Sequence, residues 1–247
     1  MNKNNNFYFL KLNNKIKSIK LDKNIPLSKY PESWKKIYFK SYVRFPKLYL
    51  DKNVIKDNSF PLLTSILKRR SYNSDNDKVH NLEKKELSTI FLSGSIINQY
   101  KDIYYNSTRA YPSGGARYPL EQYIIIFNSK TIKKGLYHYN VKLHALEYMW
   151  NITKKDVSQS FKQDFVTECS GIIIITSVIN RSAIKYGERA YTFSHIEAGH
   201  LGQNIVLLSE SIDLKCRPIG LFDNKKLMSI LDLHTNKEII LYNIAIA

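Results

Sequence analysis

The pattern of hydrophobic and polar positions along the chain predicts both strands and helices. Residues 171–179 contain four consecutive isoleucines, which is typical of a strand buried on both faces of a sheet. From about residue 189 to residue 214 apolar residues occur nearly all round the helical projection, which predicts a long core helix. Further strands are expected at 122–127, 136–139, 145–150 and 238–246, and further helices at 59–68, 82–92, 156–165 and 223–231. Because strands and helices do not alternate strictly, the pattern favours an α+β fold with a central sheet flanked by helices.

The ends of two of these helices carry capping signals. Ser59 is expected to cap the helix at 59–68, which contains Pro61 in its first turn. Asp223 is expected to cap the helix at 223–231. With 247 residues and no internal repeat or Pro- or Gly/Ser-rich linker, the chain fits one domain. We predict a basic N-terminal extension over residues 1–56, with aromatic clusters such as Trp34, Tyr38 and Phe39, and a main domain over 57–247.

Charge narrows the choice of partners only slightly. The chain has 38 basic and 21 acidic residues, and residues 1–60 hold 14 of the basic and 4 of the acidic ones. Because the lysines are scattered singly, we interpret most of this charge as solvated surface and expect no nucleic-acid partner. An acidic partner or an anionic peptide remains an alternative for the basic extension. No apolar run reaches the roughly 18 residues that span a bilayer, so we expect a soluble, cytoplasmic protein without a membrane span.

Metal and disulfide chemistry have little support in the sequence. The two cysteines, Cys169 and Cys216, are far apart and adjoin apolar segments, so we expect both thiols to be inert. His195 and His200 are five residues apart, one more than the spacing that places two ligands on one helical face. We therefore predict no metal site and interpret Glu197 and His200 as buried polar residues of the long helix.

The segment 111–121, with sequence YPSGGARYPLE, carries the clearest chemical signal. A glycine pair, Gly114 and Gly115, lets the backbone approach a flat ligand closely with its N–H groups exposed. Arg117 adds a planar donor group suited to carbonyl or phosphate oxygens. A tight turn between Pro112 and Pro119 is the alternative interpretation of the same residues.

The string PSGGARYPLE resembles the corresponding loop of SagB-type dehydrogenases, an FMN-binding branch of the nitroreductase superfamily. Four other segments resemble elements of that family in order and spacing, and the resemblance covers residues 31–247. These segments are RRSYN at 69–73, GLYHY at 135–139, KYGERAY at 185–191 and PIGLFD at 218–223. The resemblance implies a nitroreductase-like fold, with a mixed or antiparallel sheet and with FMN bound at a homodimer interface.

Cations and hydroxyls near a helix end suit the FMN phosphate, although Lys68 to Arg70 could equally be a solvated helix C-terminus. The family's loop and the turn at residues 218–223 would contact the flavin ring, the latter at its N5 edge, and Arg117 would supply positive charge. The resemblance thus implies these cofactor-binding residues: Arg69, Arg70, Ser71, Asn73, Pro112, Ser113, Gly114, Gly115, Arg117, Ile219, Gly220 and Leu221.

Lys185 and Tyr186 match the Lys-Tyr pair on which the family's activity depends. The resemblance implies an azoline dehydrogenase that converts peptide thiazolines and oxazolines to thiazoles and oxazoles in bacteriocin-like biosynthesis. Cyclodehydratase components and a precursor peptide would be its partners. Lysine among cations such as Arg181 and Arg189 would have a depressed pKa and could remove a proton, with Tyr186 as donor or relay. Which of the two is the base stays open, as does the interpretation that they merely begin a loop.

Two other functions remain alternatives. The same fold could reduce nitro groups, quinones or dehydroamino acids with NAD(P)H, although the Lys-Tyr pair argues against this. A basic binding module without flavin is the alternative from a different class of protein.

Overall fold

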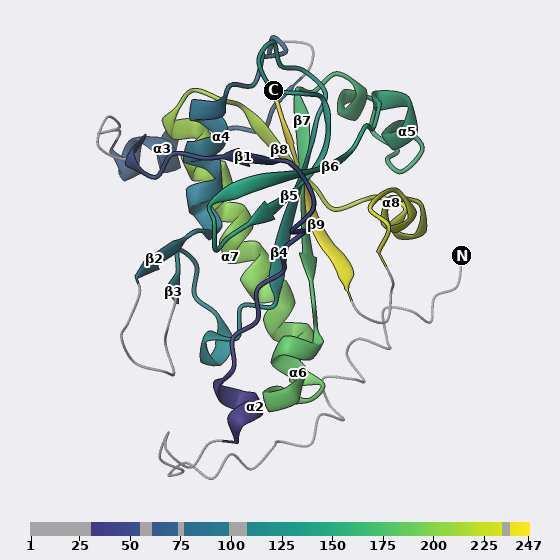
Figure 1. The fold of residues 1–247 in the computed structure, drawn as a ribbon. Coiled ribbons are helices and arrows are strands. Elements are labelled where there is room, and N and C mark those ends of the chain that lie inside the picture. The colour runs from purple at the N-terminus through teal and green to yellow at the C-terminus, as the bar shows by residue number, and fades with distance from the viewer. Residues whose placement is uncertain (1–30, 55–60, 74–76, 99–107, 234–237) are drawn as a thin grey trace, which may run out of the picture.

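The computed structural model describes residues 31–54, 61–73, 77–98, 108–233 and 238–247 (Figure 1). Its helices are α2 (Glu32–Lys35), α3 (Leu62–Lys68), α4 (Lys84–Phe91), α5 (Lys154–Ser158), α6 (Asn180–Tyr186), α7 (Arg189–Ser211) and α8 (Asn224–Ile230). Short 3-10 turns are η3 (Leu92–Gly94), η4 (Gly114–Ala116) and η5 (Asp164–Thr167). The strands are β1 (Lys47–Tyr49), β2 (Ile96–Asn98), β3 (Thr108–Arg109), β4 (Leu120–Ile126), β5 (Gly135–Asn140), β6 (Ala145–Trp150), β7 (Gly171–Ser177), β8 (Cys216–Ile219) and β9 (Ile239–Ile246).

Seven of these strands form one sheet in the order β1-β6-β5-β4-β7-β9-β8, and every pairing in it is antiparallel. Strands β2 and β3 form a separate ribbon. The isoleucine run lies in β7, which is buried along its whole length between β4 and β9. The α+β fold with an antiparallel central sheet is therefore confirmed.

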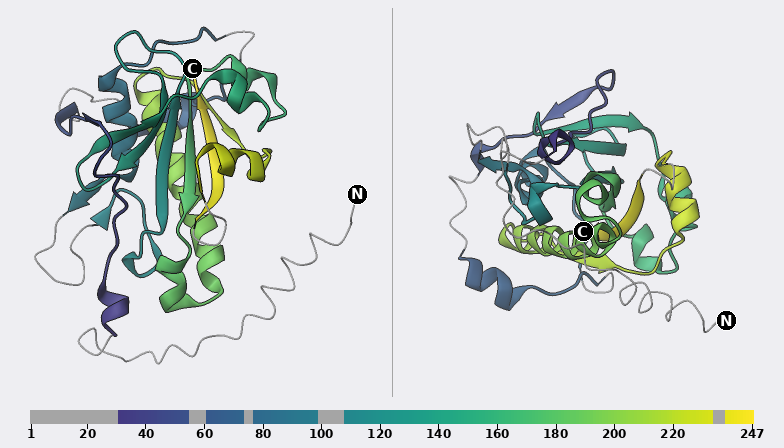
Figure 2. Two further views of the ribbon diagram at one scale, coloured as in Figure 1. Left: turned by 45° about the vertical axis from the view of Figure 1, so that its right-hand side comes forward. Right: turned by 90° about the horizontal axis from the view of Figure 1, so that it is seen from below.

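Helices cover both faces of this sheet, with the long α7 along one face and α5 and α8 on the other (Figures 1 and 2). Alternate residues of β7 point to opposite sides because strand side chains have a period of two. Ile173 and Ile175 belong to the core beneath α4 and α7, together with Leu87 and Leu201. Ile172 and Ile174 belong to the second core, which α5 and α8 cover.

Several predicted helices differ in detail from those observed. The expected helix at 156–165 is replaced by α5 and η5, because the buried Val157 and Phe165 lie on two separate short turns. Pro61 stands at the N-cap of α3 instead of inside its first turn, and Ser59 lies outside the described residues. Asp223 caps α8 as predicted, since its carboxylate accepts the Lys226 N–H at 3.1 Å.

Part of the predicted N-terminal extension belongs to the main fold. Strand β1 pairs with β6 at the edge of the sheet. Helix α2 lies beside α6, where the Trp34 indole N–H donates to the Ile184 carbonyl at 3.1 Å (Figure 1). The boundary at residue 56 stays a prediction, but residues 31–54 contribute both an edge strand and a cover for α6.

Candidate active site

The loop between β3 and β4 has a backbone that few sequences adopt. Gly115 has a φ of 59°, Ala116 of 53° and Tyr118 of 47°, so two residues with side chains lie in the left-handed region. The Ser113 hydroxyl accepts the Tyr118 N–H at 2.9 Å and holds the loop closed. Strained backbone of this kind concentrates at functional sites, because it persists only where the surrounding structure fixes it. The backbone geometry makes this loop a candidate functional site, and ligand binding by it stays a prediction.

The end of α6 meets this loop at Gly115. A Cβ atom built on Gly115 would overlap the Tyr186 hydroxyl and lie 3.1 Å from Lys185 Nζ. The Tyr186 ring also meets the Phe193 ring edge-on, with centroids 5.1 Å apart, and Phe193 in turn covers Gly114. The structure therefore brings the predicted catalytic pair together with the predicted loop, although the two segments are some 70 residues apart in sequence. Lys185 and Tyr186 end a helix and do not begin a loop.

The surroundings of Lys185 lower the pKa of its ammonium group. Burial is the main cause, and the positive charge of Arg117 adds to it. The sequence suggested Arg181 and Arg189 as the cationic neighbours, but Arg181 is paired with Glu121 and Arg189 is exposed. The Lys185 ammonium also lies 5.6 Å from the centre of the Trp34 ring. An amine with a lowered pKa is a better base near neutral pH than an ordinary lysine.

Arg117 is 2% exposed, and its guanidinium is bonded to backbone carbonyls. Its Nε donates to the Arg181 carbonyl at 2.8 Å, Nη1 to that of Trp34 at 2.5 Å, and Nη2 to that of Ser33 at 3.3 Å. The side chain ties the loop to α2 and α6. This arrangement favours a structural and electrostatic role for Arg117 over the direct flavin contact that the sequence suggested.

A buried charged network fixes α6 against the sheet. Arg181 pairs with Glu121 at 2.5 Å, and His138 lies between Glu121 and Glu147 with both nitrogen–oxygen distances at 2.9 Å. Burial opposes ionisation of Glu121, but Arg181 and His138 outweigh it and lower the pKa of Glu121 to about 2. Burial likewise opposes protonation of His138, but its two carboxylate partners raise the pKa of His138. Helix α6 therefore carries Lys185 and Tyr186 on a rigid support.

Removing one partner from this network should be costly. We expect Arg181→Met to lower the free energy of unfolding by about 3–5 kcal/mol, because the Glu121 carboxylate is left buried with less compensation. The matched control is Arg189→Met, since Arg189 is exposed at the start of α7 and should change stability by less than about 0.5 kcal/mol. Urea denaturation of the two variants measures the difference, and equal losses would contradict the role assigned to Arg181.

A second group of predicted residues lies at another part of the sheet. Ser71 forms a bridge with Cys216 at the start of β8, and the Tyr72 N–H donates to the Cys216 carbonyl at 3.0 Å. Arg70 is paired with Asp77, which also accepts the Asn73 N–H at 2.8 Å. Among the described residues none forms an ion pair with Arg69, so its charge is available to an anion.

The turn after β8 completes this second group. Ile219 is buried, whereas Gly220 and Leu221 are exposed, Leu221 by 57%. A Cβ on Gly220 would meet nothing within 4 Å, so this backbone is open to a ligand. The sheet register places Cys216 level with Gly171 at one end of β7, whereas α6 follows Ser177 at the other end. Seven residues of strand span roughly 20 Å. Residues 69–73 therefore do not meet the loop within one chain. The turn at 219–221 continues from Ile219, which is level with Ile174 in the middle of β7, and strands β9 and β7 lie between it and β4, which follows the loop.

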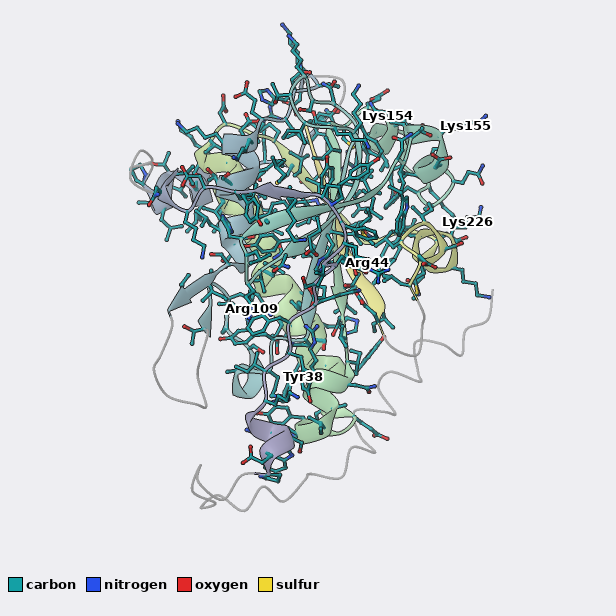
Figure 3. The ribbon with its side chains drawn as sticks, in the orientation of Figure 1. Tyr38, Arg44, Arg109, Lys154, Lys155 and Lys226 are labelled. Carbon is teal, nitrogen blue, oxygen red and sulfur yellow. The ribbon has the colours of Figure 1, made fainter. Side chains whose placement is uncertain are left out.

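Glu197 is a site residue that the sequence interpretation missed. This α7 carboxyl is 3% exposed, and its Oε1 accepts the Gly114 N–H at 3.1 Å. Burial raises the pKa of Glu197 to about 7, against the opposing effects of Ser113, Gly114 and Arg109. Arg109, whose charge opposes this rise in the pKa of Glu197, is labelled in Figure 3. Its guanidinium lies 5.1 Å from the centre of the Tyr118 ring. The sequence predicted Glu197 and His200 alike to be buried polar residues of the helix; Glu197 is buried, whereas the prediction for His200 is wrong because His200 is exposed.

Further features of the described residues that bear on function are the cysteines, possible metal clusters and possible membrane-spanning helices. Cys169 and Cys216 are buried free thiols, and burial raises the pKa of each to about 12, so the expectation that they are inert is supported. Within the described ranges no cluster of His, Cys, Asp and Glu has the geometry of a metal site. None of the helices in the same ranges is long and apolar enough to cross a bilayer.

The central sheet is antiparallel, and the glycine loop lies against Tyr186 of α6 and Phe193 of α7. The chain belongs to the nitroreductase family, whose model matches residues 66–247. Proteins of this family are flavin-binding oxidoreductases. The predicted resemblance is confirmed at this level.

Three curated relatives are similar to parts of the chain. A Methanocaldococcus jannaschii protein named as a nitroreductase is 29% identical over 49% of this chain and 63% of its own length. The trifolitoxin-processing protein TfxB of Rhizobium leguminosarum is 30% identical over 43% of this chain and 30% of its own. The microcin B17-processing protein McbC of Escherichia coli is 26% identical over 55% and 53%. The chain thus spans less than two thirds of each of these relatives.

A solved structure extends the comparison of the fold. The Escherichia coli microcin synthetase McbBCD complex, with truncated pro-MccB17 bound, contains a chain that matches with a TM-score of 0.60 at 19% identity. The match covers 91% of this chain and 82% of that one. At this identity the match establishes the shared fold.

Proposed function

We propose that this chain is an FMN-dependent dehydrogenase that oxidises thiazolines and oxazolines of a ribosomal peptide to thiazoles and oxazoles. The observation that carries the proposal is the meeting of Lys185 and Tyr186 with Gly115 of the loop. The similarity to proteins named for the processing of trifolitoxin and microcin B17 supports a role in peptide maturation. Azoline oxidation itself rests on the chemistry of the site.

The residues present fit a flavin. A pocket of about 270 Å³ lies beside Gly114 of the loop, and one buried oxygen of the Glu197 carboxyl that lines it has no hydrogen-bond partner. The loop 112–115 would hold the flat ring. Arg69, Ser71 and Asn73 would hold the phosphate. Arg70 would contribute by binding the phosphate and Asp77 at the same time. Gly220 and Leu221 would face the N5 edge with open backbone.

A second copy of the chain would complete the site. Residues 69–73 and the loop lie toward opposite ends of β7, so a homodimer would bring the loop of one copy to the phosphate residues of the other. Helix α3 leaves Leu62, Leu63, Ile66 and Leu67 between 50% and 75% exposed. Beside it an apolar groove of about 440 Å³ lies between α3, α4 and α7. Such exposed apolar surface is typical of an interface.

The residues at Gly115 suit the removal of a proton beside a carbonyl. Lys185, with its lowered pKa, takes the proton from the Cα of the azoline ring. Tyr186 donates a hydrogen bond to the adjacent carbonyl oxygen, where negative charge develops. Bound FMN would accept the hydride from Cβ, so that two hydrogens leave the ring and it becomes aromatic. Burial and, after it, the charge of Arg117 favour the neutral amine of Lys185 by lowering its pKa, and Arg117 does so without touching the substrate.

This reaction places the chain after another enzyme. An azoline forms when a cysteine, serine or threonine side chain closes on the preceding carbonyl with loss of water, so a cyclodehydratase must supply the substrate. We therefore propose cyclodehydratase components and a precursor peptide as partners, in the cytoplasm.

The proposal is tested with the purified chain and a peptide that contains azoline rings. We expect a yellow protein with a flavin absorbance spectrum, and under air a loss of two hydrogens per ring by mass spectrometry. A peptide with its rings already aromatic is the control and should stay unchanged. A colourless protein that cannot be loaded with FMN would contradict the proposal. So would a flavoprotein that reduces nitro compounds with NADPH and leaves azolines intact, which is the result expected of the alternative enzyme.

A further inference from the structure

Glu197 lies beneath the loop in a place that a bound flavin would cover. Its Oε1 holds the Gly114 N–H at 3.1 Å, whereas its Oε2 is buried without a hydrogen-bond partner. A pocket of about 270 Å³ separates this part of α7 from the loop. It is lined by Pro112, Ser113, Gly114, Phe193, Ile196, Glu197 and His200. The carboxyl therefore has one oxygen that accepts a hydrogen bond and one that is buried without a partner at the edge of the pocket.

The charged and titratable groups around this carboxyl come from several elements. Arg109 on β3 favours the ionised form by its charge but forms no ion pair with Glu197. Ser113 and Gly114 of the loop likewise favour the ionised form of the carboxyl. Tyr111, just before Pro112 of the loop, interacts electrostatically with the Glu197 carboxyl. His200 shares the pocket from the next turn of α7, and Lys185 and Tyr186 of α6 reach the loop at Gly115.

We infer that Glu197 is a positioning residue for the flavin loop, whose carboxyl holds Gly114 in place and takes up a proton when a flavin covers the pocket. This inference rests on the proposed function. Because burial has already raised the pKa of Glu197 to about 7, both protonation states are populated near neutral pH. A flavin in the pocket that Glu197 lines would replace solvent next to the carboxyl with an apolar ring, and an ionised carboxyl with a buried, unpartnered Oε2 then becomes still more costly than a neutral one.

The consequence is a linkage between flavin affinity and pH. If binding raises the pKa of Glu197 further, the complex holds a proton that the free protein loses above pH 7. Affinity is therefore full below about pH 7 and falls as pH rises, by up to about tenfold per pH unit. A neutral carboxyl still accepts the Gly114 N–H through Oε1, so the loop keeps its shape in the complex.

The test compares FMN affinity from pH 6 to pH 9 in four forms of the full chain, by quenching of flavin fluorescence. Glu197→Gln keeps an oxygen to accept the Gly114 N–H but cannot titrate. Glu197→Ala loses both the oxygen that accepts the Gly114 N–H and the titrating carboxyl. Glu188→Gln is the control, because it alters an exposed acid just before α7. We expect affinity to fall above about pH 7 in the wild type and in Glu188→Gln, relative to a flat profile in Glu197→Gln. Glu197→Ala should be flat and weaker at every pH. Titration of the FMN phosphate is common to all four and cancels in their ratios.

The outcomes separate this inference from the proposed function. Flavin binding with the same pH profile in the wild type and Glu197→Gln overturns the inference alone. Absence of flavin binding by the wild type at every pH overturns the proposed function and the inference together. If Glu197→Gln does not fold, a carbon-13 NMR titration of the glutamate carboxyls in the wild type decides instead. A resonance that titrates near 7 without FMN and stays protonated with FMN supports the inference, and one unchanged by FMN overturns it.

Discussion

Lys185→Ala is expected to lower the rate of azole formation by at least about 100-fold, because the proton on Cα then has no positioned base. The flavin should stay bound, since the Lys185 side chain contacts Gly115 only by its tip and the loop backbone is held by Ser113 and Glu197. Turnover of an azoline peptide is followed by mass spectrometry, and the flavin content by absorbance. Lys142→Ala, at an exposed hairpin turn, is the matched control and should keep wild-type turnover.

The same lysine predicts the shape of the pH profile. The proton-abstracting form of Lys185 is the neutral amine, so kcat/KM should rise with pH and level off. Because burial and Arg117 lower the pKa of Lys185, the midpoint should lie below the ordinary lysine value of 10.5. In Tyr186→Phe, kcat/KM should rise with the same midpoint pH but level off at a lower value, because the base is unchanged and the hydrogen-bond donor is lost. A Lys185→Ala enzyme that retains both turnover and profile would contradict the assignment of the base.

Gly115→Ala is expected to weaken FMN binding by at least about tenfold, which corresponds to about 1.4 kcal/mol. A methyl group at this position would overlap the Tyr186 hydroxyl, and a residue with a side chain adopts a φ of +59° only at a cost of about 1–2 kcal/mol. Both effects displace the loop from α6 and from the position in which it would hold the ring.

The control for Gly115→Ala is Gly199→Ala. Gly199 lies within α7, where a new Cβ would meet nothing within 4 Å. Alanine should stabilise that helix by up to about 1 kcal/mol without changing flavin affinity. Fluorescence titration of the two variants with FMN makes the comparison. Wild-type affinity in Gly115→Ala would show that the glycine pair only reverses the chain.

The fold was predictable where hydrophobic period and residue type agree. Four isoleucines in a row predicted β7, and the apolar positions from residue 189 onward predicted α7 within a few residues. The helix α3 shows the limit of such patterns. Leu62, Leu63, Ile66 and Leu67 lie on one apolar helical face, yet they are exposed in the chain by itself. Periodicity reports that a face is apolar and not whether this chain or a second copy covers it.

The candidate site was predictable only in part, because its electrostatics depend on contacts far apart in sequence. Arg117 looked available to a ligand, but its donors are bonded to carbonyls of α2, 83 and 84 residues earlier, and of α6. Glu197 looked like a polar residue within a helix bundle, but it holds the Gly114 amide 83 residues earlier. Neither contact leaves a periodic signal along the chain. Lys185 and Tyr186 were found through resemblance, and the structure adds their approach to Gly115.

Anaerobic mixing of the flavin-loaded protein with an azoline peptide tests the central claim most directly. The account predicts that the flavin absorbance bleaches with one equivalent of azoline ring per flavin, in the absence of NADH or NADPH, and that it returns when air is admitted. A flavin that NADPH bleaches rapidly and that an azoline peptide leaves fully oxidised would contradict it.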